Sequence, residues 1–249
     1  MRDATGFLLM MSALLMAGCA AYQQSPLVQA AESGRTDQVA RLLAGGADPR
    51  ERTPRGFTAL GLAAREGRVE VIELLVRAGA DPNLRDTNEN EWTPLLNAVH
   101  THQREAVVTL LRLGADPDIG GGLTPLIMAA GYGDTDMVRL LLDRGADPYR
   151  AVKPGENALG AAVGGSIDID KWTLGDCQTE TVTLLLERAP DLRLPRSVFG
   201  SFDIWKARMG NCAEVLRLVG SQRGAPRAAS AGSRERPPAI ASSRSTEVR

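Results

Sequence analysis

The sequence predicts an all-α protein built as a solenoid of five to six helical-hairpin repeats. Three observations predict it: a four-residue segment that recurs at a regular interval, a helix-start signal in phase with that segment, and an apolar stripe between the two. A unit of this length cannot bury a core alone, so its stability comes from stacking on neighbouring units. Such stacks present an extended surface to other molecules.

The recurring segment is Gly-Ala-Asp-Pro, and its successive aspartates are separated by 33, 35 and 31 residues. An interval of this size is typical of stacked-repeat proteins. The glycine is suited to ending a helix, and the Asp-Pro pair to starting a turn. The four copies are Gly46–Pro49, Gly79–Pro82, Gly114–Pro117 and Gly145–Pro148.

Each unit opens with a signal for a first helix. Ser, Thr or Asn at an N-cap accepts a hydrogen bond from an unpaired N–H, and Pro at the next position has no donor to lose. We expect each first helix to be rich in small residues and to end at a left-handed glycine such as Gly34, Gly67 or Gly133. The start signals are Ser25–Leu27, Thr58–Leu60, Thr93–Leu95, Thr124–Leu126 and Asn157–Leu159.

The second helix of each unit carries an apolar stripe at helical spacing, which is expected to face the stack. The stripe comprises Val39, Leu42 and Leu43; Val71, Ile72, Leu74 and Leu75; Val107, Val108, Leu110 and Leu111; Val138 and Leu140–Leu142; and Val182 and Leu184–Leu186.

Taken together, these in-phase motifs resemble the ankyrin repeat over about residues 25–220, with five readable copies and a degenerate sixth from about Ser197. The resemblance implies a protein-binding module. The family usually has His directly after Thr-Pro-Leu, and this chain does not, so we expect a stiffening hydrogen-bond network to be absent and the array to be less rigid. The departing residues are Gly61, Leu96, Ile127 and Gly160.

Residues 1–18 are expected to be a lipoprotein signal peptide, because the apolar run from Phe7 to Ala17 is too short for a stable transmembrane helix. Met16–Cys19 resembles the bacterial lipobox, whose Cys is lipidated; a plain secretory signal is the alternative. Ala20 resembles the pattern of lipoproteins sorted to the outer membrane. The expectation is therefore a palmitate-type anchor at Cys19, a short tether over 19–24, and a protein facing the periplasm.

Residues 221–249 are expected to form a disordered basic tail, with six Arg against two Glu and few bulky apolar residues. A solvated tail without a partner is favoured over one that contacts an anionic surface. Export would also let Cys177 and Cys212 form a disulfide. Stacked helices lie about 10 Å apart, and a disulfide needs Cα atoms within about 7 Å. A bridge across an irregular last repeat is nevertheless favoured over two free thiols.

No catalytic, cofactor, metal or small-molecule site is predicted. The only two histidines, His100 and His102, are interpreted as a solvent-facing pair, because a zinc site needs at least three ligands. Gly120–Gly122 lacks the Lys-Ser/Thr of a phosphate loop and is expected to form a tight turn. Residues 19–220 are acidic, with 22 Lys and Arg against 27 Asp and Glu. This charge and the expected export both argue against a nucleic-acid partner.

The resemblance implies that a protein partner would bind the concave side. That side is formed by the corner after each first helix and by the turn fingers over 50–57, 84–92, 119–123 and 149–156. The second finger, two residues longer than standard, carries Glu89, Glu91 and Trp92. The corner residues are Glu32, Arg65, Glu66, His100, Thr101 and Tyr132.

The fifth repeat is extended by a loop over Ser166–Leu174, which packing does not require. Trp172 on this loop either covers the degraded last repeats or anchors a partner. A calcium site at Asp168 and Asp170 is disfavoured, because the other oxygen ligands are missing. The partner itself is expected to be an envelope protein that this chain scaffolds or helps to assemble. The alternative is an immunity or inhibitor lipoprotein that neutralises a periplasm-acting toxin enzyme.

Overall fold

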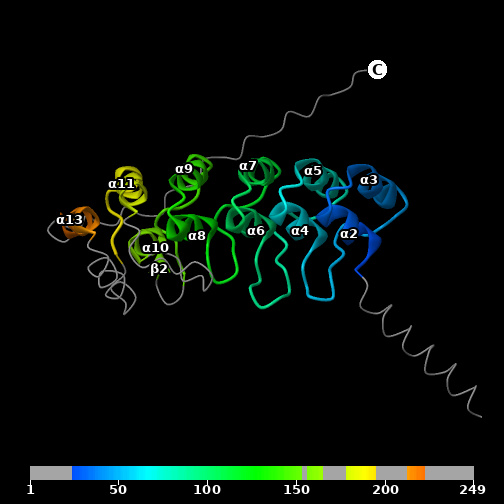
Figure 1. Ribbon diagram of the computed structural model, residues 1–249, viewed down its shortest axis with the longest axis horizontal. Coiled ribbons are helices and arrows are strands. Elements are labelled where there is room, and N and C mark those ends of the chain that lie inside the picture. Colours follow the sequence, from blue (N-terminus) through cyan, green and yellow to red (C-terminus); the bar gives the residue numbers. More distant parts are fainter. Residues whose placement is uncertain (1–23, 153–155, 165–177, 195–211, 222–249) are drawn as a thin grey trace, which may run out of the picture.

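The computed structural model describes residues 24–152, 156–164, 178–194 and 212–221. These residues form helical hairpins that stack side by side in two rows (Figure 1), which confirms the repeat solenoid. The first helices are α2 (Pro26–Glu32), α4 (Ala59–Arg65), α6 (Pro94–His100), α8 (Pro125–Tyr132) and α10 (Ala158–Gly164). The second helices are α3 (Thr36–Ala44), α5 (Val69–Arg77), α7 (Arg104–Arg112), α9 (Thr135–Asp143) and α11 (Thr179–Arg188).

The predicted start and stop signals are confirmed. The N-cap oxygens of Ser25, Thr58, Thr93, Thr124 and Asn157 each accept from the N–H three residues later, at 2.9–3.2 Å. The glycine of each Gly-Ala-Asp-Pro is left-handed, with φ between 90° and 101°. The following Asp accepts from the N–H two residues on, at 2.9 Å in all four copies. The sequence repeat therefore produces the same N-cap and turn hydrogen bonds in each unit.

The core lies between the two rows of helices. First helices are buried on nearly every side by small and aliphatic residues, and α4, for example, is buried from Ala59 to Ala64. Second helices bury only one side of the predicted stripe, such as Val71, Ile72 and Leu75 in α5. The rest of the stripe is only partly buried: Leu42, Leu43, Leu74, Val108, Leu111, Leu142 and Leu186.

The corner glycines Gly34, Gly67 and Gly133 are left-handed as predicted, with φ of 72°, 65° and 69°. His102 occupies the same corner in α6–α7 with φ of 57°. A Cβ on each glycine would lie within 3.0 Å of a long side chain of the next repeat, as Gly67 would of Gln103. At His102 the neighbour is the short Asp134, so the imidazole has room and its Nδ1 lies 2.9 Å from Asp134 Oδ2.

Two short strands, β1 (Ala151–Val152) and β2 (Glu156–Asn157), pair antiparallel in the fourth finger, which the sequence did not predict. Arg52 and Thr58 form an isolated bridge at the corresponding place in the first finger. The third finger bends over residues 121–123, just before Thr124, so the change of direction lies one residue later than the turn expected at Gly120–Gly122. The fingers are therefore short hairpin-like turns held at their bases.

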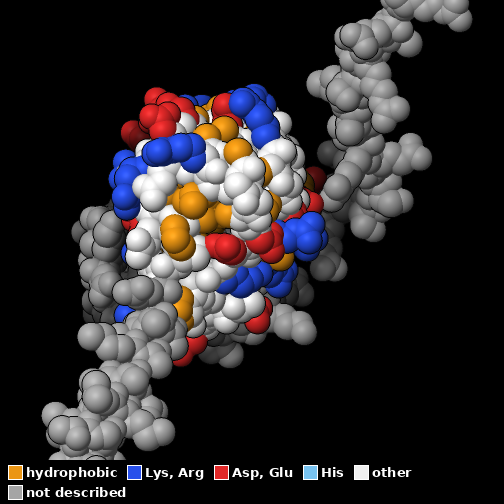
Figure 2. All heavy atoms as spheres, turned by 90° about the vertical axis from the view of Figure 1, so that its right-hand side faces the viewer, with side chains coloured by type: hydrophobic (Ala, Val, Ile, Leu, Met, Phe, Trp, Pro, Cys, Tyr) orange, Lys and Arg blue, Asp and Glu red, His pale blue; other side chains and the backbone are white. Residues whose placement is uncertain are grey.

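Figure 2 looks onto the end of the stack formed by α2 and α3. Apolar side chains lie near the middle of this end, among Arg, Asp and Glu side chains. The exposed apolar residues of the two helices are Pro26, Ala40 and Ala44. All three are small, so the described end of the array offers only a modest apolar surface.

At the other end lies α13 (Ala213–Ser221), whose last residue is the first of the predicted tail. Cys212, just before α13, is buried and disulfide-bonded. Its pairing with Cys177 stays a prediction, because Cys177 lies outside the described residues. The same holds for Cys19, Asp168, Asp170 and Trp172. Within the described ranges, no helix has both the length and the apolarity to cross a bilayer.

Leu95→Ala should destabilise the stack by about 3 kcal/mol, because Leu95 is fully buried in α6 and its truncation leaves a cavity. Urea unfolding followed by circular dichroism measures this loss. Arg139→Ala, on the exposed side of α9, should change the free energy of unfolding by less than about 0.5 kcal/mol. Equal effects of the two variants would contradict the assignment of the core.

Candidate functional site

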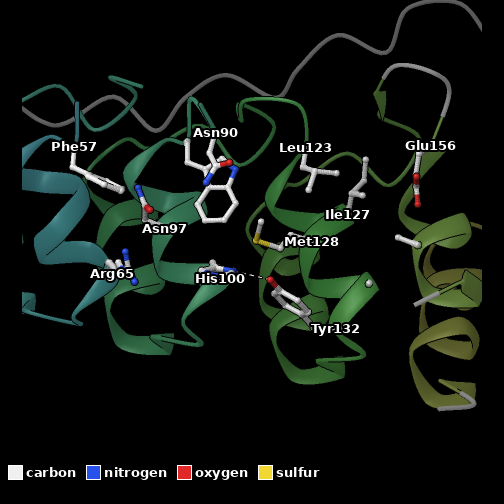
Figure 3. Close-up of a pocket in the computed structure, with 13 residues that line it drawn as sticks. Phe57, Arg65, Asn90, Asn97, His100, Leu123, Ile127, Met128, Tyr132 and Glu156 are labelled. Carbon is white, nitrogen blue, oxygen red and sulfur yellow. Dashed lines mark hydrogen bonds between the residues drawn. The ribbon is translucent and has the colours of Figure 1, made fainter. Parts of the chain in front are cut away.

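A groove runs along the base of the fingers across the second to fifth repeats, with a volume of about 390 Å³ (Figure 3). Its lining residues occupy three equivalent positions of the repeat. One row directly precedes the N-caps: Phe57, Trp92, Leu123 and Glu156. A second row lies four residues after the N-caps and comprises Asn97, Met128 and Ala161. A third row lies seven residues after the N-caps and comprises Arg65, His100 and Gly131. Asn90, Ile127 and Tyr132 complete the lining.

An aromatic cluster forms one wall of the groove. The rings of Trp92 and His100 lie 4.7 Å apart, and His100 Nδ1 is 2.6 Å from the Tyr132 hydroxyl. The His102 ring lies 5.4 Å from the Tyr132 ring. His102 is exposed as expected, but His100 is half-buried, so its interpretation as solvent-facing was wrong. The reason is that His100 packs between aromatic side chains contributed by a finger and by the next repeat.

A buried hydrogen-bond network supports the floor of the groove. Asp86, only 2% exposed, accepts from the backbone N–H and the hydroxyl of Thr58 at 2.8 and 3.1 Å. Its other oxygen accepts from Asn97 Nδ2 at 2.9 Å. The network ties the second finger to the first helices of the second and third repeats. This network differs from the one that the family's histidine would supply, so it does not test the expected absence of the histidine network.

The network also explains Gly61. A Cβ there would lie 2.8 Å from Thr58 Oγ1, closer than real Cβ atoms approach other atoms, and only 3.0 Å from Asp86 Oδ1. Leu96 and Ile127 hold the same position in the next two repeats. The departure from the family pattern at Gly61 thus makes room for the buried carboxylate.

Asn97 presents a hydrogen-bond acceptor to the groove. Its Nδ2 donates to Asp86 Oδ2 and to the Thr93 carbonyl, so the amide orientation is set by a carboxylate that can only accept. Among the described residues, no donor reaches Asn97 Oδ1. Because Asn97 lines the groove, this oxygen is an acceptor within reach of a ligand.

Each end of the groove carries an ionisable side chain. Arg65 lies at the second-repeat end and Glu156 at the fifth-repeat end (Figure 3). Arg65 is exposed, and its guanidinium forms no ion pair with any described residue. Glu156 is 9% exposed and belongs to β2. Between these ends the lining is mostly apolar and aromatic.

The family model for ankyrin repeats (3 copies) matches residues 5–86, 27–121 and 83–152, which together cover more than half of the chain. The chain belongs to the ankyrin repeat family. An ankyrin repeat-containing protein of Treponema pallidum (strain Nichols) is 37% identical over 78 residues, or 30% of this chain and 26% of that protein. The B-cell lymphoma 3 protein homolog of Mus musculus is 33% identical over 147 residues, or 57% of this chain and 33% of that protein. The chain thus spans about a third or less of these relatives.

Ankyrin repeats imply protein–protein interaction, and the relatives are of a class that typically binds proteins without catalysing reactions. Within the residues that the structure describes, no three His, Cys, Asp or Glu side chains gather as metal ligands would.

This ankyrin repeat chain brings together four of the predicted contact residues: Arg65, Trp92, His100 and Tyr132 line the groove. Glu66, Glu89 and Glu91 are exposed but lie outside the lining. Thr101 has a structural role, because its hydroxyl donates to the Arg65 carbonyl of the preceding repeat at 2.6 Å.

The second finger has the predicted two extra residues. Asp86 N–H bonds the Trp92 carbonyl, whereas in the first finger Thr53 N–H bonds the Phe57 carbonyl. The extra length lies beyond this closing bond, at the tip that carries Glu89 and Glu91. Trp92, at the base, is held by the closing bond.

Phe57, Asn90, Leu123 and Glu156 lie in the predicted fingers, which the sequence analysis gave only as ranges. The sequence analysis did not predict contacts at the other groove residues: Asn97, Ile127, Met128, Gly131 and Ala161. A signal for four of the lining residues was present, since the residue before each N-cap reads Phe57, Trp92, Leu123 and Glu156 in phase. The role of Asn97 had no such signal, because it depends on Asp86 in another segment.

Asp86→Asn should change how stability depends on pH. Burial raises the pKa of the Asp86 carboxyl above 3.8, outweighing the hydrogen bonds from Thr58 and Asn97 and the charge of Arg52. The folded state therefore binds the carboxyl proton of Asp86 more tightly than the unfolded state does. As a result, the free energy of unfolding falls as pH rises above about 3.8. Each unit of pKa difference corresponds to about 1.4 kcal/mol.

Urea unfolding of both proteins between pH 3 and 7 measures this difference. The wild-type value minus the Asp86→Asn value should be constant at the acid end and should decrease as pH rises. Altered hydrogen bonds in the variant add an offset that does not depend on pH. A difference that increases with pH would show that the hydrogen bonds, and not burial, dominate.

Proposed function

We propose that this ankyrin repeat protein is a non-enzymatic scaffold or assembly aid for another protein of the bacterial envelope. The partner binds the concave face that carries the groove. A lipid on Cys19 holds the protein at the membrane, no further from it than the tether over 19–24 permits. The observation that carries the proposal is the in-phase row of Phe57, Trp92 and Leu123 across three repeats.

The composition of the groove supports protein recognition. Interfaces typically combine an apolar, aromatic centre with a polar rim. Here Trp92, Leu123 and Ile127 supply the centre, and Arg65 and Asn90 lie at exposed positions around it. A standard interface buries about 800 Å² on each partner, so the groove would form the centre of a larger contact that includes the fingers.

Deletion separates this proposal from its alternative, an immunity or inhibitor lipoprotein. A scaffold predicts that the partner loses its activity or its location whether or not a toxin is present. An inhibitor predicts a tight one-to-one complex, and cell death on deletion only when the toxin enzyme is present. The in-phase row serves either role, so the two are distinguished in the cell.

Cys19→Ser should abolish incorporation of radiolabelled palmitate, because the acyl chains would be carried by that residue. Labelling of growing cells, followed by capture of the protein and autoradiography, measures incorporation. Ala20→Ser, one residue away, should retain the label. A label that persists in the Cys19→Ser protein would contradict lipidation at this position.

Trp92→Ala should reduce capture of the partner, because truncating a central interface aromatic typically lowers affinity by about 30-fold or more. Crosslinking in the intact envelope, followed by mass spectrometry, identifies and quantifies what is captured. Leu111→Ala is the control, since Leu111 lies on α7 and lines no part of the groove. Circular dichroism verifies that both variants are folded. Equal capture by the two folded variants would contradict binding through the groove.

A further inference from the structure

We infer that the groove binds one large apolar side chain from an extended segment of the partner, together with the backbone amide and a carboxylate beside it. This inference rests on the proposed function and names the chemistry that the groove recognises. Three features carry it: the apolar centre, the acceptor on Asn97 that lacks a donor among the described residues, and the exposed guanidinium of Arg65.

The apolar centre sets the size and kind of side chain. Trp92 and Leu123 come from the fingers, and Ile127 and Met128 come from α8. The volume of about 390 Å³ lies in the range of sites that hold small ligands or single anchoring groups. It suits a side chain such as Phe or Leu with the adjoining backbone, and not a whole helix.

The acceptor on Asn97 selects a donor. The hydrogen bond from Asn97 Nδ2 to Asp86 fixes the orientation of the Asn97 side-chain amide. Asn97 therefore cannot turn its N–H groups toward the groove without breaking a buried network. A ligand that covers Asn97 Oδ1 without donating to it would leave a buried acceptor unsatisfied, which is unfavourable. An extended peptide supplies a backbone N–H next to each side chain and meets this requirement.

Charge sets the direction of the bound segment. Arg65 lies at one end of the groove and carries no ion pair with any described residue, whereas a carboxylate, Glu156, lies at the other end. A carboxylate of the ligand is therefore attracted toward Arg65. The segment is oriented with its acidic group toward the second repeat.

N-acetyl-L-phenylalanine is a probe that carries all three groups: a phenyl ring, an amide N–H and a carboxylate. Titrated into the full chain labelled with ¹³C at Met and Ile methyl groups, it should shift the Met128 and Ile127 signals with a Kd of about 1 mM, as its size predicts. The ester analogue 2-acetoxy-3-phenylpropanoate, which lacks the N–H, should bind about tenfold more weakly. This comparison tests Asn97 without disturbing Asp86.

Variants separate the remaining contributions. Arg65→Gln should reduce binding of N-acetyl-L-phenylalanine to the level of its uncharged amide. Arg139→Gln removes an equal charge from the exposed side of α9 and should leave binding unchanged. Leu123→Ala should weaken the acid and the amide by the same factor. Equal affinity for the acid and the amide in the wild type would overturn the role of Arg65.

If no signal shifts at about 10 mM probe, the inference is overturned. The proposed function would then still be tested separately, by crosslinking capture in the envelope. Probe binding with no protein captured in the envelope would support the groove chemistry and contradict the proposed function. Shifts that follow protein concentration without probe would indicate a second copy as the occupant. Binding that requires removal of residues 222–249 would indicate the chain's own tail. Either of the last two results overturns the inference.

Discussion

The fold depends on burial of each short first helix against its neighbours. These helices have about two turns, a length that is marginal in water without packing partners. Ala63, Ala98 and Ala130 are completely buried, and their small side chains let successive helices approach closely. Each repeat is therefore stable only because the next repeat covers it, which gives the array its shape and fixes the spacing of the fingers.

Side chains that reach between fingers reinforce this stacking. Asn83 accepts from the Asp116 N–H at 2.8 Å and donates to the Gly114 carbonyl at 3.2 Å. Asp118, at the same position of the next repeat, accepts from the Asp147 N–H at 2.9 Å. Ion pairs between second helices, such as Arg188 with Asp143, lie in solvent and contribute less. The described stack is thus held more firmly along its finger side than along its outer row.

Local features of the fold were predictable from the sequence, and contacts between distant segments were not. Thr58, Thr93 and Thr124 predict the starts of their helices from local sequence alone, because an N-cap hydrogen bond joins residues only three apart. The Asp86–Thr58 bond joins residues 28 apart, and nothing in either segment alone indicates it. Similarly, a glycine rule predicts the corners at Gly34, Gly67 and Gly133 but not at His102. That exception becomes intelligible only when Asp134 is seen opposite the ring.

The closing bond between Asp86 and Trp92 divides the second finger into a fixed base and a projecting tip. This bond fixes the backbone of Trp92, and the indole packs against the His100 ring at 4.7 Å before any encounter. A molecule that packs on this ring therefore does not have to bear the entropy of ordering it, and more of the contact free energy appears as affinity. The tip beyond the closing bond carries Glu89 and Glu91 at exposed positions, so a fixed aromatic anchor is combined with an acidic border.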